Sequence, residues 1–365
     1  MSRPISVRAS RREIVRLTAG LGGMAALQGF GAVVGFGLAP AMAANLNITT
    51  LRSTSRSWLW AAEDFAIGAG HFDKAGLKVA MAATERGVNH DALLGGAADV
   101  LLGAPQQNMR VQILGKPVVV MAGFVNKFAS NIVVRKEFAD KAGVTEDSPV
   151  EAKAAVLKGL RLGTTGPGGG PDQLLRHFLR LAGADPTRDA TLVPVRGGTA
   201  MIAAMQQKQI DGFCLSSPTS DLAVDKAGAT YLFNMANNPP ADLADFLYIC
   251  ASITEETGKT KADELTAYCR GIALALKAIH EDRDAFKTWA RGWFSAMDDQ
   301  LFETSFKNNI NIYMKTPVPT QAQFDVNVRF LQEALKDAGQ KPVPADYSYD
   351  KAFDLRFARK ALESI

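Results

Sequence analysis

Short strand patterns alternate with helix patterns along this chain, and the alternation occurs twice. The first run predicts strands over residues 46–53, 77–84, 100–102 and 116–125, and helices over 57–67, 89–98 and 106–114. The second run predicts strands over 160–164, 191–195 and 211–215, and helices over 171–181 and 199–207. Strands that alternate with helices form mainly parallel sheets with helices on both faces. The sequence therefore predicts an α/β protein of two lobes.

The two runs share residues as well as pattern. Each contains an Arg-Gly pair, an aspartate before a strand and a proline after it: Arg86-Gly87, Asp99 and Pro105 in the first run, and Arg196-Gly197, Asp211 and Pro218 in the second. The Arg-to-Asp spacings are 13 and 15 residues, and the Asp-to-Pro spacings are 6 and 7. Two similar lobes in tandem explain this correspondence. The alternative is coincidence between two ordinary βαβ units, because these turn residues are common.

The remaining segments predict how the chain passes between the lobes. Residues 128–135 leave the first lobe and residues 244–252 leave the second, and helices follow over 261–280, 283–297 and 320–338. We therefore predict a signal peptide over 1–43, the first part of lobe 1 over 44–130, lobe 2 over 131–246, and a return to lobe 1 with C-terminal helices over 247–365. Two crossings form a two-strand hinge, which permits opening and closing about one axis.

The first 43 residues have the pattern of an export signal. Arg11-Arg12 precede apolar residues and a further base, a glycine-rich apolar stretch covers 17–38, and Ala41-Met42-Ala43 fits a signal-peptidase site. The paired arginines resemble the twin-arginine signal. We therefore predict export to the periplasm by the twin-arginine route, with cleavage after Ala43. An uncleaved anchor is the alternative, although the many glycines disfavour a spanning helix.

The charge of the chain excludes two classes of partner. The formal net charge is +4, but the predicted signal contains five arginines and one acid. Residues 44–365 therefore hold 36 basic and 36 acidic side chains. A neutral body lacks the basic surface that nucleic acids or anionic membranes require. We expect a monomer without a nucleic-acid partner.

The residue types that carry catalysis or hold metals are not grouped in this sequence. None of the four histidines (His71, His90, His177 and His280) has a partner at the spacing of a metal motif. The cysteines Cys214, Cys250 and Cys269 fit buried thiols, and a Cys250–Cys269 disulfide is compatible with an oxidising periplasm. There is no G-x-S-x-G motif, and the glycine-rich stretch 163–171 lacks the G-K-[ST] ending of a phosphate loop. We therefore expect no enzyme activity, no metal and no cofactor.

A ligand site is expected where the loops at the carboxyl ends of the strands meet. In open parallel sheets of order 2-1-3, ligands bind at the point where the strand order reverses. The loops at that point are 53–58 and 103–106 in lobe 1, and 166–173 and 216–219 in lobe 2. The candidate substrate-binding residues lie in these loops and at neighbouring strand ends: Ser53, Thr54, Ser55, Arg56, Trp58, Gly103, Pro105, Gln106, Phe124, Asn126, Gly166, Gly168, Gly169, Gly170, Gln173, Ser217 and Pro218.

These loops predict a site for an anionic group. Several of them open a helix, where free backbone N–H groups and the helix dipole favour anions. We expect Arg56 and the amides of 168–170 to hold the anion, with Trp58 and Phe124 flanking an organic body. Alternatives stay open: Asp172 caps its own helix and occupies the glycine amides, Trp58 packs in the core, and Arg56 is solvated or paired with an acid.

Four motifs carry a resemblance to a known family: ALLGGAADVLLGAP, LKGLRLGTTGPGGGPDQLL, AAMQQKQIDGFCLSSP and FLYICAS, which lie within residues 92–252. The chain over 45–365 resembles the solute-binding proteins of ABC importers, in particular the sulfonate, nitrate, taurine and thiamine-precursor group. The resemblance implies a type II periplasmic-binding-protein fold. It also implies capture of a small organic or oxo-anionic solute and delivery to an ABC permease in the inner membrane.

The chain departs from this group at one position. Where the group usually has Asp-Pro-Tyr or a similar aromatic residue, this sequence has Ser217-Pro218-Thr219, which predicts a different ligand-facing surface. Two other functions use the same fold: a periplasmic sensor that presents its ligand to a signalling receptor, and an enzyme like the fungal thiamine-pyrimidine synthases. The cysteine cluster and the active-site histidine of those enzymes have no evident match here.

Overall fold

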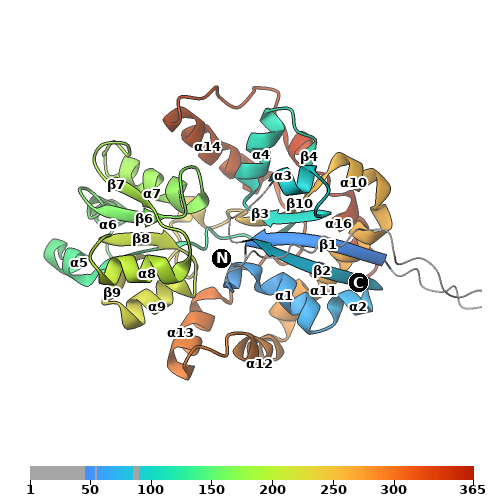
Figure 1. The fold of residues 1–365 in the computed structure, drawn as a ribbon, viewed down its shortest axis with the longest axis horizontal. Helices are drawn as coiled ribbons and strands as arrows, with labels where there is room; N and C mark the ends of the chain where they lie inside the picture. Colours follow the sequence, from blue (N-terminus) through green and yellow to red (C-terminus); the bar gives the residue numbers. More distant parts are fainter. Residues whose placement is uncertain (1–45, 54–55, 85–89) are drawn as a thin grey trace, which may run out of the picture. The chain divides into compact units, whose positions relative to one another are not determined.

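The computed structural model describes residues 46–53, 56–84 and 90–365, which form two five-stranded sheets with helices around them (Figure 1). The first sheet has the order β2-β1-β3-β10-β4 and the second β7-β6-β8-β5-β9. The strands of the first sheet are β1 (Leu46–Ser53), β2 (Leu77–Thr84), β3 (Val100–Gly103), β4 (Val118–Val125) and β10 (Ile249–Thr254). Those of the second are β5 (Asn131–Arg135), β6 (Arg161–Thr164), β7 (Thr191–Pro194), β8 (Gly212–Leu215) and β9 (Ala229–Phe233). The predicted signal peptide, Thr54, Ser55 and the pair Arg86-Gly87 lie outside the described residues.

Helices follow most of the strands. Those before the second crossing are α1 (Ala61–Gly68), α2 (His71–Lys74), α3 (His90–Leu94), α4 (Pro105–Ile113), α5 (Lys136–Ala142), α6 (Val150–Ala155), α7 (Gly170–Leu181), α8 (Gly198–Gln206) and α9 (Thr219–Lys226), with short 3-10 helices η1 (Trp58–Trp60) and η2 (Ala241–Leu243). The later ones are α10 (Glu255–Thr260), α11 (Ala262–Glu281), α12 (Arg283–Trp293), α13 (Asp299–Asn309), α14 (Gln321–Asp337), α15 (Tyr349–Ala352) and α16 (Arg356–Leu362). In the described part of the chain, no helix is long and apolar enough to cross a bilayer.

The predicted alternation of strands and helices is confirmed, although some bounds differ and the patterns did not predict several elements, among them helices α2, α5, α6 and α9. The strands over 46–53 and 77–84 have the predicted bounds. Helix α3 ends at Leu94 instead of residue 98, because Gly95 and Gly96 follow it and Gly96 adopts a left-handed φ of 72°. Strand β9 and helix α13 were not predicted.

Each sheet contains one strand that runs against its neighbours. β10 pairs antiparallel with β3 and β4, and β5 pairs antiparallel with β8 and β9. β1 pairs parallel with β2 and β3, and β6 with β7 and β8, so both sheets have the predicted 2-1-3 order. The sheets are therefore mixed, and the reversed strand in each is the one that follows a crossing between the sheets.

The inner strands of each sheet are buried on both faces, whereas the edge strands β2 and β7 are largely exposed or half-buried. In β3, Leu101 packs in a cluster with residues of α3 and α4, whereas Val100 and Leu102 belong to the larger core on the other face. In β5, Val133 packs with Met201 of α8, and its neighbours face the larger core. The alternation along each strand follows from side chains that point to opposite faces.

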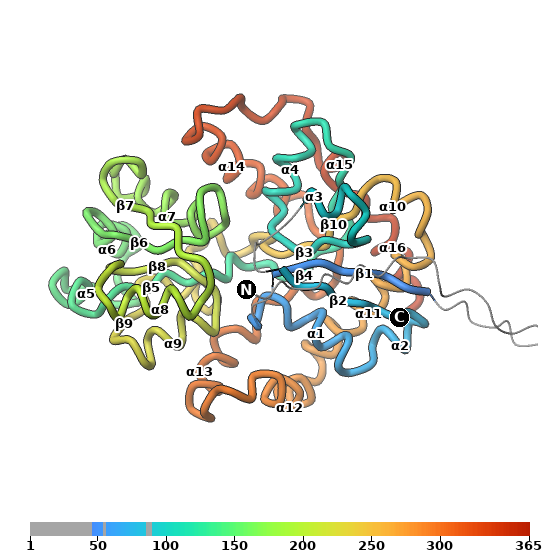
Figure 2. The backbone as a smooth tube through the Cα atoms, viewed as in Figure 1, coloured from blue at the N-terminus to red at the C-terminus, as the bar shows by residue number. Residues whose placement is uncertain are grey.

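The two crossings lie side by side and are joined by hydrogen bonds. The Phe246 N–H donates to the Asn126 carbonyl and the Tyr248 N–H to the Val125 carbonyl, both at 2.8 Å. The Phe128 ring stacks on Tyr248 with centroids 4.5 Å apart. The chain also returns past this place, because the Asn126 N–H donates to the Ile312 carbonyl at 2.9 Å. Further along the chain, helix α14 lies beside α4 (Figure 2).

The repeated aspartates have the same structural role in both sheets. Asp99 Oδ2 accepts the Thr49 N–H of β1 at 2.9 Å, and Asp211 Oδ2 accepts the Arg161 N–H of β6 at 2.9 Å. Each carboxylate thus binds the backbone of the middle one of the three parallel strands of its sheet, β1 at Thr49 and β6 at Arg161. Burial by itself would raise the pKa of Asp211, but hydrogen bonds and charge from Arg161 and a hydrogen bond from Arg135 lower the pKa overall. This shared role supports two lobes in tandem over coincidence.

We expect Asp211→Ala to lower the free energy of unfolding by about 1–3 kcal/mol, because a buried backbone N–H and two arginines lose their acceptor. Asp211→Asn keeps an acceptor oxygen and should lose less. Asp140→Ala is the matched control, because exposed Asp140 pairs only with exposed Lys136 on the next helical turn. Urea unfolding followed by circular dichroism measures the difference. Equal stability of Asp211→Ala and Asp140→Ala would contradict this role.

Candidate functional site

The predicted ligand loops of the two lobes meet in this structure. Ser57, in the loop between β1 and η1, has its Oγ 3.1 Å from Ser216 Oγ and donates to the Ser217 carbonyl at 2.9 Å. All three residues are buried, and Ser217 is 0% exposed. The Ser57 side chain also caps η1 by accepting the Leu59 N–H. The carboxyl ends of β1 and β8 therefore face each other, as the strand order predicted.

A buried carboxylate that sequence analysis missed lies behind this contact. Asp221 of α9 accepts a hydrogen bond from Ser217 Oγ at 2.9 Å and another from the Tyr231 hydroxyl. Asn308 of α13 donates in turn to the Tyr231 hydroxyl at 3.5 Å. Burial raises the pKa of Asp221, and these donors partly offset the rise. The network fixes the β8–α9 loop against α13, so it positions Ser217.

Trp58 lies in the core, so the prediction that it flanks a ligand does not describe this structure. It is 0% exposed, its ring centroid is 4.4 Å from that of Phe294, and its indole N–H donates to Ser305 Oγ at 2.7 Å. Phe124 is likewise 0% exposed and part of the core. Both residues were assigned from their chain position, which does not fix the direction of a side chain. Neither has a surface left for a solute.

The Arg56 side chain contacts Trp293 and not the region of the predicted anion site. Its guanidinium lies 4.7 Å from the centroid of the Trp293 ring, and Nη1 donates to the Trp293 carbonyl at 2.9 Å. The residue is exposed. Its charge is therefore held at the end of α12 by a cation–π contact and a carbonyl. This arrangement does not provide the anion contact that we predicted for Arg56.

Backbone N–H groups of the glycine-rich loop already donate hydrogen bonds within the protein. The Gly168 N–H donates to Asp172 Oδ2 at 3.0 Å, and the Gly169 N–H donates to the Gly166 carbonyl at 3.2 Å. Asp172 also pairs with Arg176 at 3.0 Å. The alternative in which Asp172 occupies the loop amides is therefore the one observed for Gly168. Two of the three amides predicted to hold an anion are engaged within the loop.

The other predicted residues are placed around the β3–α4 turn and the crossing. Gly103 ends β3 and its carbonyl accepts from Cys250 Sγ, while Pro105 is the first residue of α4. Gln106 is 3% exposed, and its Nε2 has no partner within the described residues. Asn126 lies half-buried at the crossing and donates to Asp245 at 3.3 Å. Of this group, Gln106 has a hydrogen-bond donor available.

Four predicted residues lie where the loops begin or turn. Ser53 ends β1 and is half-buried, and Pro218 precedes α9 and is half-buried as well. Gly166 adopts φ 129°, a conformation that only glycine readily takes. Gly170 begins α7, and a Cβ there would lie 3.0 Å from the Tyr248 hydroxyl. Glycine at 170 therefore allows the lobe 2 loop to approach the crossing closely.

Polar residues of α3 and α4 that we did not predict lie near the same turn. His90 Nε2 is 2.7 Å from Asn108 Oδ1, and burial lowers the pKa of His90. Arg110 of α4 lies against Gly168: its Nη1 is 3.2 Å from the place a Cβ on Gly168 would take. The sequence contained one signal for Arg110, because it follows Gln106 by four residues and so shares its helix face.

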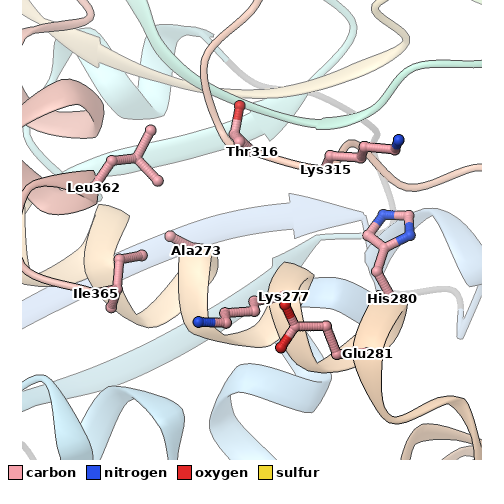
Figure 3. Close-up of a pocket in the computed structure, with 8 residues that line it drawn as sticks. All are labelled: Ala273, Lys277, His280, Glu281, Lys315, Thr316, Leu362 and Ile365. Atoms are coloured by element: carbon pink, nitrogen blue, oxygen red, sulfur yellow. The ribbon is translucent and has the colours of Figure 1, made fainter.

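A cavity of about 270 Å³ lies between the lobes, next to Arg110 and Gly168. It is lined from lobe 2 by the glycine-rich loop and α7, including Gly168 and Gln173, and from the other side by α4 and α14, including Arg110 and Phe330. A second cavity of about 320 Å³ is lined only by residues that follow β10 (Figure 3). Its lining includes Lys277, His280 and Lys315. Only the first cavity contains residues from both lobes.

No metal or thiol chemistry is evident in the described residues. They contain no group of three or more histidine, cysteine or acidic side chains that could hold a metal ion. The three cysteines are free and buried, so the structure contains no Cys250–Cys269 disulfide. Burial raises the pKa of Cys250 to about 12 and raises the pKa values of Cys214 and Cys269 as well. Such thiols remain protonated and unreactive at neutral pH.

Parts of this chain are similar in sequence to known proteins. Residues 59–240 match the model of the NMT1-like family. The nitrate/nitrite binding protein NrtA of Nostoc sp. strain PCC 7120 is 35% identical over 88 residues, which are 24% of this chain and 20% of that protein. The chain thus aligns with only a fifth of that curated relative.

Solved structures resemble the chain over most of its length. The alkanesulfonate-binding protein SsuA from Xanthomonas axonopodis pv. citri, bound to MOPS, has a TM-score of 0.63 and 16% identity, and the match covers 86% of this chain and 98% of that one. The periplasmic nitrate-binding protein NrtA from Synechocystis PCC 6803 has a TM-score of 0.64 and 15% identity, covering 88% and 89%. This likeness confirms the two-lobe periplasmic-binding-protein fold. These relatives are substrate-binding proteins, not enzymes.

We expect Trp58→Phe to lower the free energy of unfolding by about 1–2 kcal/mol, because it removes the buried hydrogen bond to Ser305. Ser305→Ala is the matched variant, since it removes the same bond from the other side. Denaturant unfolding measures both. If Trp58→Phe left the stability unchanged, the indole would not be part of the core as described.

Proposed function

We propose that this chain is the solute-binding component of an ABC importer. It captures a small organic or oxo-anionic solute between its two lobes and delivers it to a permease in the inner membrane. The observation that carries the proposal is the contact of Ser57 with Ser216 and Ser217, which brings corresponding loops of two similar lobes face to face. The fold and the names of the relatives support the same role.

The two crossings form the hinge about which the lobes open and close during capture. Two adjacent segments with main-chain hydrogen bonds restrain twisting, yet they can bend about one axis. A solute that contacts both lobes binds the closed form better than the open form, so it shifts the population toward closure. Closure changes the surface formed by the two lobes together, and a permease can thereby distinguish the loaded protein from the empty one.

The available polar groups favour a small solute with oxygen or nitrogen atoms at its surface. Gln106 offers a buried donor that has no partner among the residues that the structure describes, and half-buried Arg110 lies at the boundary of the lobes. The relatives are named for nitrate, nitrite and alkanesulfonate, which are small anions. We therefore infer an anionic solute for this chain too, bound by a monomer without a cofactor.

We expect small-angle X-ray scattering to show a smaller radius of gyration when a bound solute is present. Ser216→Trp should block the closed form, because the indole would fill the contact with Ser57, and it should weaken solute binding measured by calorimetry. Ser364→Trp, at an exposed position near the C-terminus, is the control and should behave as wild type. An unchanged radius at saturating solute would contradict closure, and turnover of the solute would contradict a binding role.

We also infer export by the twin-arginine route to the periplasm, from Arg11-Arg12 and the segment over 17–43. Replacing both arginines with lysine should leave the precursor in the cytoplasm, whereas the unchanged chain should start at Ala44 after export. Fractionation and N-terminal sequencing measure these outcomes. Normal export of the double-lysine variant would contradict the twin-arginine route, and periplasmic protein that starts at Ser2 would contradict cleavage.

A further inference from the structure

The cavity between the lobes holds three arginines, of which two are already paired. Arg176 pairs with Asp172 at 3.0 Å. Arg180 reaches from α7 to α14, where it pairs with Glu333 at 3.0 Å and Asp337 at 2.9 Å. Both guanidinium groups are therefore engaged with the three carboxylates of Asp172, Glu333 and Asp337.

Arg110 is the third arginine, and it has no carboxylate partner within the described part of the chain. It is half-buried on α4, and it lines the cavity together with Gly168 and Gln173. A guanidinium presents five donors in a planar fork, which suits the oxygens of a carboxylate or a sulfonate. Arg110 is therefore the cation of this cavity that remains available to a ligand.

The guanidinium of Arg110 lies against bare backbone of the other lobe. Its Nη1 is 3.2 Å from the position that a Cβ on Gly168 would occupy, and Gly168 has a φ of 74°. A side chain at 168 would be strained by this backbone conformation and would also press on the guanidinium. An anion held by Arg110 would therefore lie beside the glycine-rich loop, so that it contacts both lobes.

Gln173 supplies a second, independent polar group in the same cavity. It is 6% exposed, and its Nε2 donates to the Gly168 carbonyl at 3.0 Å. Its Oε1 has no partner within the described residues. A buried carbonyl oxygen without a donor is costly, so a ligand that offers it an O–H or N–H group gains affinity.

We propose that Arg110 and Gln173 form the anchoring site for a small oxyanion that also carries a hydrogen-bond donor. Arg110 binds the anionic group, and the Gln173 oxygen accepts from the hydroxyl or amino group. This inference rests on the proposed solute-binding function and identifies its charged contact. It assigns to Arg110 the role that the sequence suggested for Arg56.

Calorimetry with two probe anions tests the site on the exported, full mature chain. The probes are ethanesulfonate and 2-hydroxyethanesulfonate, which differ only in one hydroxyl group. We expect the wild type to bind both and to prefer the hydroxylated probe. Arg110→Ala should weaken the binding of both by about ten- to a hundredfold, and Arg110→Lys should retain part of it. Gln173→Leu should abolish the preference between the two probes.

Lys116→Ala is the matched control, because it removes one exposed positive charge close to the end of α4 and should leave both affinities unchanged. Arg110→Gln replaces Arg110→Ala if the alanine variant fails to fold, as judged by its thermal melt. Wild-type affinity in the Arg110 variants would overturn the inference while the solute-binding function stands. A wild type that binds neither probe at millimolar concentration would also overturn it, whereas the scattering experiment with solute judges the function separately.

Discussion

The two crossings between the sheets constrain the rest of this structure. Strands β5 and β10 each enter their sheet directly from the other lobe. The two sheets are therefore connected by two adjacent segments of the chain. The Phe246 and Tyr248 amides bond to the first crossing, and the Phe128 ring stacks on Tyr248 and packs tilted against Phe246. With the sheets tied at this place, the carboxyl ends of β1 and β8 come face to face, and the loops that follow them form one shared surface.

That shared surface is held by polar groups that water does not reach. Trp58 donates to Ser305 of α13, and Ser57 bonds to Ser217, which bonds to Asp221. The Tyr231 hydroxyl bonds to Asp221 and accepts from Asn308 of α13, so polar groups join both loops to α13. Buried polar groups are stable only when their partners are in place. The network therefore sets the position of the loops, whereas Gln106 and Gln173 each have a side-chain atom with no partner within the described residues, which we propose a solute supplies.

The fold was largely predictable, because apolar periodicity reports burial on a strand or helix, and the repeated aspartates marked equivalent strand starts. Strand order also predicted that the loops after β1 and β8 lie together, and of the predicted ligand loops the one over 166–173 lines the cavity between the lobes. The side chains were not, since chain position does not fix direction: Arg56 turns to Trp293, and Trp58 turns into the core. Arg110 was missed because it lies inside α4 and not in a loop. Its four-residue spacing from Gln106 was the signal that could have revealed it.

We propose that the two lobes together hold one small solute. Native mass spectrometry of protein purified from the periplasm of its own host tests this most directly. We expect a folded chain that carries a single, noncovalently bound small molecule, released on mild activation and identifiable as an anion. A folded, exported chain that shows only its own mass, and that stays so after incubation with an extract of the host's growth medium, would contradict it.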